Sequence, residues 1–212
     1  MSARAIGLPA EMGVTDSAML VSKRMIGDKW RTIAPEVEFG IVPHGANRIK
    51  KRLEGVCQEL GYTYIDPTVS QDQSIGDIIG KIRSCRTIVT ESLHGAIVAD
   101  AFGIPWIPAV FYHPVLVFKW NDWCRSLGLH DPFDVVTRAR IFLIDQIRRV
   151  GKVLGRQWFL ASMITHSMLR STVVKCTQDR LMLSDRVVMK AKTDELVHLL
   201  SKIREDYRRG LI

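Results

Sequence analysis

Short apolar runs alternate with segments of helical periodicity between residues 39 and 110, and this alternation constrains the fold more than any other feature. The run at residues 39–44 is stopped by Pro43, as expected for a short buried strand. Comparable runs follow at residues 62–65, 87–90 and 104–110. A repeat of strand and helix predicts a parallel sheet with crossover helices, which is a Rossmann-like α/β layer.

Three helices are expected between these strands, over residues 48–60, 71–83 and 93–102. Apolar residues recur along the first two at the spacing of one helix face: Ile49, Leu53, Val56, Leu60, Ile75, Ile78, Ile79 and Ile82. Asn47 is placed to cap the first helix at its start. Gly61 and Gly103 follow the first and third helices, as glycine commonly does at a helix end.

The chain beyond residue 114 has a different character. Residues 115–127 predict an aromatic-rich helix, and residues 138–170 and 185–208 predict helices without a strand between them. Residues 138–212 hold 16 Lys and Arg against 7 Asp and Glu, whereas residues 1–137 hold 14 against 15. We therefore expect an N-terminal junction segment (1–30), a Rossmann-like domain (31–137) and a basic, mainly helical tail (138–212), which could contact an anionic membrane surface.

Composition excludes several other classes of protein. The four cysteines have neither zinc-finger spacing nor the pattern of a disulfide framework, so reduced thiols in a cytoplasmic protein are expected. The N-terminus has no signal-peptide core, and the sequence has no apolar stretch long enough to span a membrane. Nucleic-acid binding is not expected, because the basic residues lack interleaved aromatic side chains and a recognisable motif.

Two histidine-bearing turns are expected at the carboxyl edge of the sheet, where open parallel sheets bind ligands. The turn with His44 precedes the first helix, and the turn with His94 lies at the start of the third. Free N–H groups at a helix start favour an anion such as a phosphate or carboxylate. Gly95 would keep the second turn small and open. The sequence therefore predicts an anion site with His94 as its most promising side chain.

Other interpretations of these residues stay open. His44 is equally compatible with a structural hydrogen-bonding role, and Ser92 is an ordinary N-cap candidate. Glu91 either influences His94 or stabilises the start of the helix through its charge. The spacing of Ser92 and His94 does not indicate a hydrolase triad, and the sequence has no GxSxG, Walker or GxGxxG motif.

Residues 90–106 resemble the signature block of the polysaccharide pyruvyl transferase family, in the branch that acts in bacterial exopolysaccharide synthesis of the succinoglycan type. Residues 41–44 and 64–67 are similar to further segments of that branch, and residues 2–9 with 14–16 to the stretch near the domain junction of the family. The resemblance covers roughly residues 1–112. It implies one half of a GT-B-like fold, in which two Rossmann-like domains enclose a cleft.

The resemblance also implies an activity. The family transfers pyruvyl from phosphoenolpyruvate onto two hydroxyls of a sugar and forms a cyclic ketal, without a metal or a cofactor. His94 matches the histidine that contacts the donor and is the candidate catalytic acid. The donor-binding set expected around it is His44, Asn47, Arg48, Glu91, Ser92 and Gly95. The acceptor would be a lipid-linked oligosaccharide or polysaccharide, reached from the cytoplasm or the inner face of the membrane.

Two departures from the family pattern change these expectations. Some relatives carry Arg two positions before the signature histidine, where this chain has Ser92, so Arg48 or a residue of another domain would have to supply the cation. The chain also begins where the first domain of the family should be ending, which suggests an inactive half or one that needs a missing domain or a second copy. The alternatives are a glycosyltransferase using a nucleotide sugar and a non-catalytic module associated with membrane or polysaccharide.

Overall fold

The computed structural model describes residues 15–24, 34–111, 115–134, 137 and 164–210. Of the helix expected over residues 138–170, the part up to residue 163 lies outside these residues. The described elements, in chain order, are η3 (Ser17–Leu20), α1 (Val21–Arg24), β1 (Val37–Val42), α3 (Lys50–Leu60), β2 (Thr63–Tyr64), α4 (Ile75–Arg83), β3 (Cys85–Thr90), α5 (Leu93–Ala101), β4 (Trp106–Pro108), α6 (Val117–Ser126), α9 (His166–Cys176) and α10 (Arg186–Arg208).

The four strands form one parallel sheet in the order β2-β1-β3-β4, which confirms the predicted α/β class with a parallel sheet. The central pair, β1 and β3, is in register from Val37 opposite Cys85 to Val42 opposite Thr90. The chain thus moves from β1 outward to β2 and then returns past β1 to build β3 and β4. The direction of strand addition reverses between β1 and β3.

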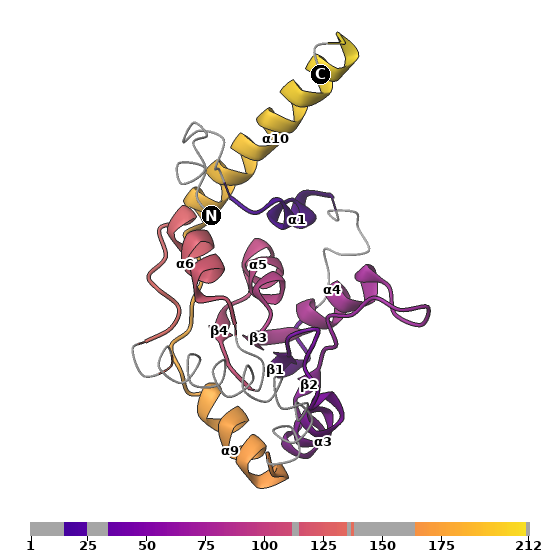
Figure 1. Ribbon diagram of the computed structural model, residues 1–212, viewed down its shortest axis with the longest axis vertical. Coiled ribbons are helices and arrows are strands. Elements are labelled where there is room, and N and C mark those ends of the chain that lie inside the picture. Colours follow the sequence, from indigo (N-terminus) through magenta and orange to yellow (C-terminus); the bar gives the residue numbers. More distant parts are fainter. Residues whose placement is uncertain (1–14, 25–33, 112–114, 135–136, 138–163, 211–212) are drawn as a thin grey trace, which may run out of the picture.

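Helices cover both faces of the sheet (Figure 1). Helices α3 and α9 cover one face, where Ile41, Leu53 and Leu169 belong to the same buried cluster. Helices α4, α5 and α6 cover the other, where Ile88, Ile97 and the buried face of α6 belong to a second cluster. Each strand of the central pair therefore contributes alternate side chains to two cores, as expected for a doubly covered parallel sheet.

The observed helix starts differ from the predicted ones for local reasons. Helix α3 begins at Lys50 rather than residue 48, because the Asn47 side chain accepts a hydrogen bond from Ile49 N at 2.9 Å and holds the intervening residues in a turn. Helix α4 begins at Ile75 rather than residue 71, since Ser74 and Asp77 form a reciprocal capping box there. Ile75, expected on the buried face, is consequently 59% exposed.

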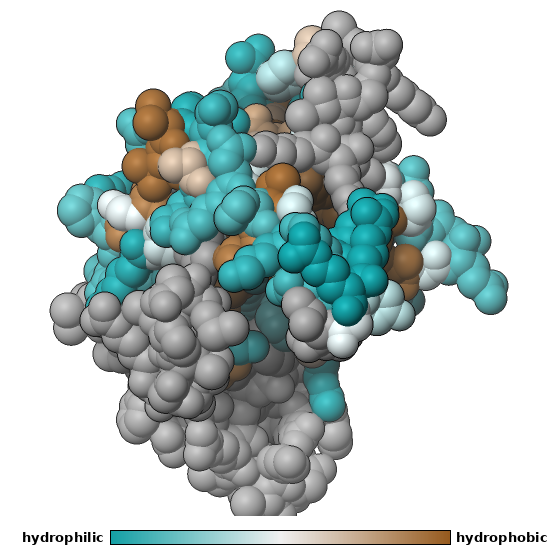
Figure 2. Space-filling model, turned by 90° about the horizontal axis from the view of Figure 1, so that it is seen from above, coloured by the Kyte–Doolittle hydropathy of each residue, from teal (hydrophilic) through white to brown (hydrophobic). Residues whose placement is uncertain are grey.

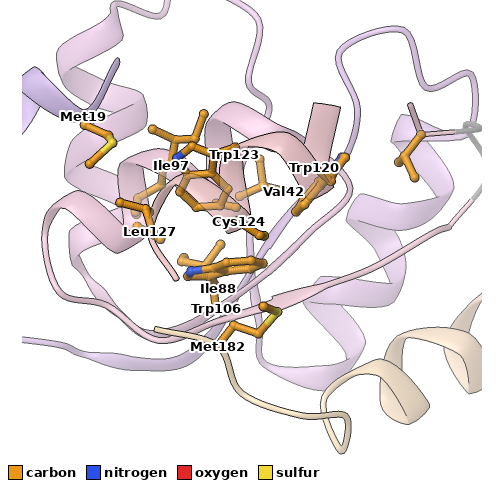
Figure 3. Close-up of a cluster of buried hydrophobic side chains, with 14 of the residues drawn as sticks. Met19, Val42, Ile88, Ile97, Trp106, Trp120, Trp123, Cys124, Leu127 and Met182 are labelled. Carbon is orange, nitrogen blue, oxygen red and sulfur yellow. The ribbon is translucent and has the colours of Figure 1, made fainter. Parts of the chain in front are cut away.

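Trp106 fills the centre of the core on the α5 and α6 side (Figure 3). Its ring centroid lies 5.9 Å from that of Trp120 and 5.4 Å from that of Trp123, both on α6. Met182, from a segment 76 positions later in the chain, packs into the same cluster. Two aromatic residues of the helix expected beyond residue 114, Trp120 and Trp123, are therefore part of the core of the sheet domain, whereas Phe118 is 55% exposed.

The segment before α10 joins the edge of the sheet. Met182 and Trp106 exchange two backbone hydrogen bonds of 2.8 and 2.9 Å in an antiparallel bridge beside β4. The carboxylate of Asp100, which is fully buried in α5, accepts hydrogen bonds from Trp106 Nε1 at 2.8 Å and from both the backbone N and the hydroxyl of Ser184. Arg186 donates to the Asp100 carbonyl oxygen at 2.9 Å.

The division of the chain at residue 137 stays a prediction, but residues on both sides of it share the two cores. Leu169 and Val173 of α9 are buried beside α3, and Met189 of α10 is buried beside η3 and α5. The segment expected to be a tail therefore supplies apolar side chains to the sheet domain.

The outer part of α10 extends beyond the rest of the molecule (Figure 1). Along it, Leu200, Ile203 and Tyr207 are at least half exposed. Viewed from above, the described surface is mostly hydrophilic, with hydrophobic side chains in separate patches (Figure 2). Within the described residues, every helix is too short or too polar to cross a bilayer.

Candidate functional site

The carboxyl ends of β1 and β3 are the place where a doubly wound sheet most often binds its ligand, because strand addition reverses between them. The turn after β1 contains His44, and the turn after β3 contains Glu91 and leads into α5 at Leu93. The two histidine-bearing turns predicted from the sequence thus leave neighbouring strands at this reversal. Their detailed geometry shows which side chains hold the edge together and which stay accessible.

Glu91 holds three segments of this edge together. Its side chain is fully buried, and Oε2 accepts hydrogen bonds from His44 N at 3.0 Å and Asn47 Nδ2 at 2.9 Å. The other oxygen, Oε1, accepts from Phe111 N, beyond β4, at 3.0 Å. A buried carboxylate is expensive unless it is well hydrogen-bonded, and here three donors satisfy that requirement. Glu91 therefore joins the segments that follow β1 and β4 to its own turn.

Ser92 caps α5, as its residue type suggested. Its Oγ accepts a hydrogen bond from Gly95 N at 3.4 Å. The Thr90 hydroxyl accepts a hydrogen bond from Ser92 N at 3.0 Å and donates one to Ser92 O at 2.8 Å. The cap fixes the direction in which the first turn of the helix leaves the sheet. The cap role that the sequence also allowed for Glu91 belongs to Ser92, since the Glu91 carboxylate binds other segments.

Gly95 lies so close to the strands that its surroundings have no room for a larger side chain. A Cβ at this position would lie 2.6 Å from Thr90 Oγ1 and 3.1 Å from Val42 Cγ1. The first turn of α5 therefore sits directly on the ends of β1 and β3. The sequence-based expectation of a small residue is met, and the reason is this close approach to the strands.

Substituting Gly95 by alanine should destabilise the domain by about 1–3 kcal/mol, because the new methyl group overlaps Thr90 and Val42. Chemical denaturation of the variant would measure the loss. Gly55, inside α3, is the matched control, because a Cβ there would meet no atom within 4 Å. Gly55→Ala should be neutral or stabilising by about 0.5–1 kcal/mol. Equal stability of the two variants would contradict the close packing of α5.

His94 is an exposed side chain of this edge. It occupies the first turn of α5, and its side chain is 74% exposed. The nearest acidic group is Asp16, whose Oδ2 lies 4.0 Å from His94 Nε2. Asp16 itself caps η3, where its Oδ1 accepts from Ala18 N at 2.8 Å. An imidazole at the positive end of a helix, open to solvent, can meet an anionic ligand directly.

The remaining predicted residues of the first turn have mainly structural contacts. His44 is partly buried, and its Nδ1 accepts a hydrogen bond from Ala46 N at 3.2 Å. Asn47 is buried and uses its amide on Glu91 and Ile49. Arg48 is exposed, one residue further along. The structure thus joins His44, Asn47 and Glu91 by hydrogen bonds, while His94 faces Asp16.

The segment that carries these turns is similar in sequence to known proteins. Residues 23–111 match the family model described as polysaccharide pyruvyl transferase. This match confirms the resemblance to that family that was predicted from the sequence. A curated relative, the succinoglycan biosynthesis protein ExoV of Rhizobium meliloti (strain 1021), is 34% identical over 129 residues. That alignment covers 61% of this chain and 39% of the relative, so the chain spans well under half of its length. No solved structure matches.

The matched segment, residues 23–111, contains every residue of the predicted donor site, from His44 to Gly95. It ends at Phe111, whose backbone N binds Glu91. Helices α6, α9 and α10 lie beyond it, as does Asp16 on the other side. The roles of the individual site residues stay predictions, which the experiments below address.

Sequence reasoning missed a cation at the neighbouring strand end. Lys50, at the start of α3, donates to both oxygens of Asp66 at 3.0 and 3.1 Å and to the Thr68 hydroxyl at 3.0 Å. Burial raises the pKa of Asp66, but hydrogen bonds from Thr68 and Lys50 outweigh it and hold the pKa below its ordinary value. The Asp-Pro signal that ended the second strand was visible in the sequence, but its pairing with Lys50 required the fold. Among the described residues, no cluster of His, Cys, Asp and Glu is arranged to hold a metal ion.

Proposed function

We propose that this chain is part of a transferase that moves a pyruvyl group from phosphoenolpyruvate onto a sugar of an exopolysaccharide precursor and forms a cyclic ketal. The match of residues 23–111 to the family model supports the transferase reaction, and the name of the relative supports a role in exopolysaccharide synthesis. The donor, the ketal product and a cytoplasmic place of action belong to the proposal. Because the chain spans 39% of the relative, the proposal includes a further domain or chain that completes the site.

The observation that carries the proposal is the exposed His94 at the first turn of α5. Phosphoenolpyruvate carries a phosphate and a carboxylate, and the N–H groups and positive end of a helix stabilise such anions. Glu91, the nearest carboxylate in the sequence, is buried and accepts hydrogen bonds from three donors of the chain, so its charge is compensated within the fold.

The chemistry assigns His94 a proton transfer. When a sugar hydroxyl oxygen bonds to C2 of the donor, the C2–C3 double bond takes up a proton at C3, and the hydroxyl loses its own proton. Attack by a second hydroxyl at C2 then closes the ketal ring and breaks the bond from C2 to the phosphate oxygen, and the departing phosphate takes up the proton of that hydroxyl. A positioned imidazolium suits the first of these steps, since imidazole side chains ordinarily titrate near neutrality. His44 and the exposed Arg48, on the adjoining turn, would hold the anionic ends of the donor.

His94→Ala should abolish phosphoenolpyruvate binding measured by calorimetry and, in the completed enzyme, lower donor-dependent turnover by about 10²- to 10⁴-fold. His198→Ala is the matched control, because His198 is exposed on α10 outside the family segment. It should bind and react as the unmodified protein does. If His94→Ala binds phosphoenolpyruvate normally and keeps its turnover, His94 has no role at the donor.

The two alternative functions give different results in the same assays. A nucleotide-sugar glycosyltransferase would bind a nucleoside diphosphate and ignore phosphoenolpyruvate. A membrane module would bind anionic vesicles through α10, but the charges of that helix are partly neutralised within it, by Lys190 with Asp194 and Lys192 with Glu195. Membrane-surface helices usually carry a polar face rich in unpaired Lys and Arg. The pyruvyl transfer proposal is therefore the one we favour.

A further inference from the structure

Asp16 reaches the start of α5 from a part of the chain 78 residues before His94. The short helix η3 that it caps packs against α5, and Met19 of η3 is fully buried in the core. On its other side, the Thr15 hydroxyl lies 2.9 Å from the Ser126 hydroxyl at the end of α6. Asp16 is thus held in place by neighbours anchored to two different helices of the domain.

The carboxylate of Asp16 has two oxygens with different surroundings. Oδ1 accepts the hydrogen bond from Ala18 N that caps η3, which fixes the rotation of the group. Oδ2 is the oxygen that lies 4.0 Å from His94 Nε2. The cap needs one oxygen only, so the second is available to the histidine. An exposed pair of this kind adds little to stability, and folding alone therefore does not explain the arrangement.

We propose that Asp16 is a positioning residue that orients the His94 imidazole through its second carboxylate oxygen. This inference rests on the proposed function of His94 as the acid that protonates the donor. At 4.0 Å the pair is just beyond hydrogen-bonding distance, and catalytic hydrogen bonds commonly tighten when substrate binds. With Nε2 directed at Asp16, Nδ1 is the nitrogen that exchanges the proton with the donor. A carboxylate is also a suitable neighbour for the charged imidazolium form that a general acid requires.

Two substitutions separate this role from the cap. Asn and Ser are both good N-cap residues, so Asp16→Asn and Asp16→Ser should each preserve η3 and the melting temperature. Asp16→Asn removes the charge, and Asp16→Ser removes the oxygen that faces His94. The control is Asp185→Asn, because Asp185 caps α10 in the same way, accepting from Val187 N and Val188 N.

The first measurement uses this chain alone. Ring ¹H and ¹⁵N resonances of His94, assigned with His94→Ala, should move in both Asp16 variants and stay in place in Asp185→Asn. The second uses the completed enzyme, in which both Asp16 variants should lower kcat by about ten-fold or more at nearly unchanged KM for phosphoenolpyruvate. In the His94→Ala background the same substitutions should have no further effect, because Asp16 acts through the histidine.

Each outcome decides one of the two proposals. Unmoved His94 resonances, or an active enzyme whose kcat survives both Asp16 substitutions, would overturn the positioning role and leave pyruvyl transfer intact. A further loss of kcat in the His94→Ala background would also overturn it, since Asp16 would then act independently. Complete absence of phosphoenolpyruvate-dependent turnover in the unmodified, completed protein would count against the proposed function, while the resonances would still decide whether Asp16 holds the ring.

Discussion

Replacing Glu91 by glutamine is expected to lower the free energy of unfolding by about 2–4 kcal/mol, although the two side chains have nearly the same shape. The carboxylate accepts from His44 N and Asn47 Nδ2 on one oxygen and from Phe111 N on the other. An amide keeps one oxygen and turns an NH₂ group toward a buried N–H donor. At least one hydrogen bond is then lost, and two donors face each other without water.

Urea denaturation of the variant would measure this effect, with Glu38→Gln as the control. Glu38 is exposed and pairs loosely with Arg86, with the two charged groups 3.6 Å apart. Its substitution should change stability by less than about 1 kcal/mol. A Glu91→Gln protein as stable as the control would mean that the carboxylate does not hold the three segments together. Because those segments form the edge at which the donor is expected, weakened donor binding should accompany the loss of stability.

Replacing Asp100 by alanine should cost still more, about 3–5 kcal/mol of unfolding free energy. The substitution removes the buried acceptor of Trp106 Nε1 and of both the backbone N and the hydroxyl of Ser184. These donors stay buried without partners, and the volume of the carboxylate is left empty. The near-ultraviolet circular dichroism of the tryptophan cluster around Trp106 should change together with stability, since the indole loses its hydrogen bond.

Asp179→Ala provides the comparison, because Asp179 is exposed in the segment between α9 and α10. It should unfold at nearly the same urea concentration as the unmodified protein. Ser184→Ala removes the hydroxyl donor and leaves the backbone donor, so its loss should be smaller than that of Asp100→Ala. A wild-type tryptophan spectrum and wild-type stability in Asp100→Ala would contradict the role of this carboxylate as a link between α5 and the segment before α10.

The sequence predicted the sheet domain well because the necessary information is local. Short apolar runs and helical periodicity were enough to place β1, β3 and α5. Together with the glycines at helix ends and the residues after each strand, they also predicted where the two histidine-bearing turns would meet. The capping role of Ser92 was likewise visible from residue type and position.

The features that the sequence did not predict depend on contacts between residues far apart in the chain. Asp100 and Ser184 are 84 positions apart, and neither residue type signals a partner at that distance. The approach of Asp16 to His94 was not predicted from the sequence, because it follows from the packing of η3 on α5. Glu91 could be recognised as important, but whether its carboxylate faces a ligand, a helix or three backbone segments is decided by burial, which a single sequence does not record.

The bridge between Trp106 and Met182 has a consequence for how the protein is made. On a ribosome, β4 emerges long before the residues that complete its outer edge and satisfy Asp100. Until residues 182–189 have been synthesised, the nascent domain has an unpaired strand edge and a buried carboxylate that lacks the two hydrogen bonds from Ser184, and the open edge favours association with other chains. Expression of shortened versions that stop near residue 137 should therefore yield aggregates, because they lack the segment that covers the edge of β4 and binds Asp100.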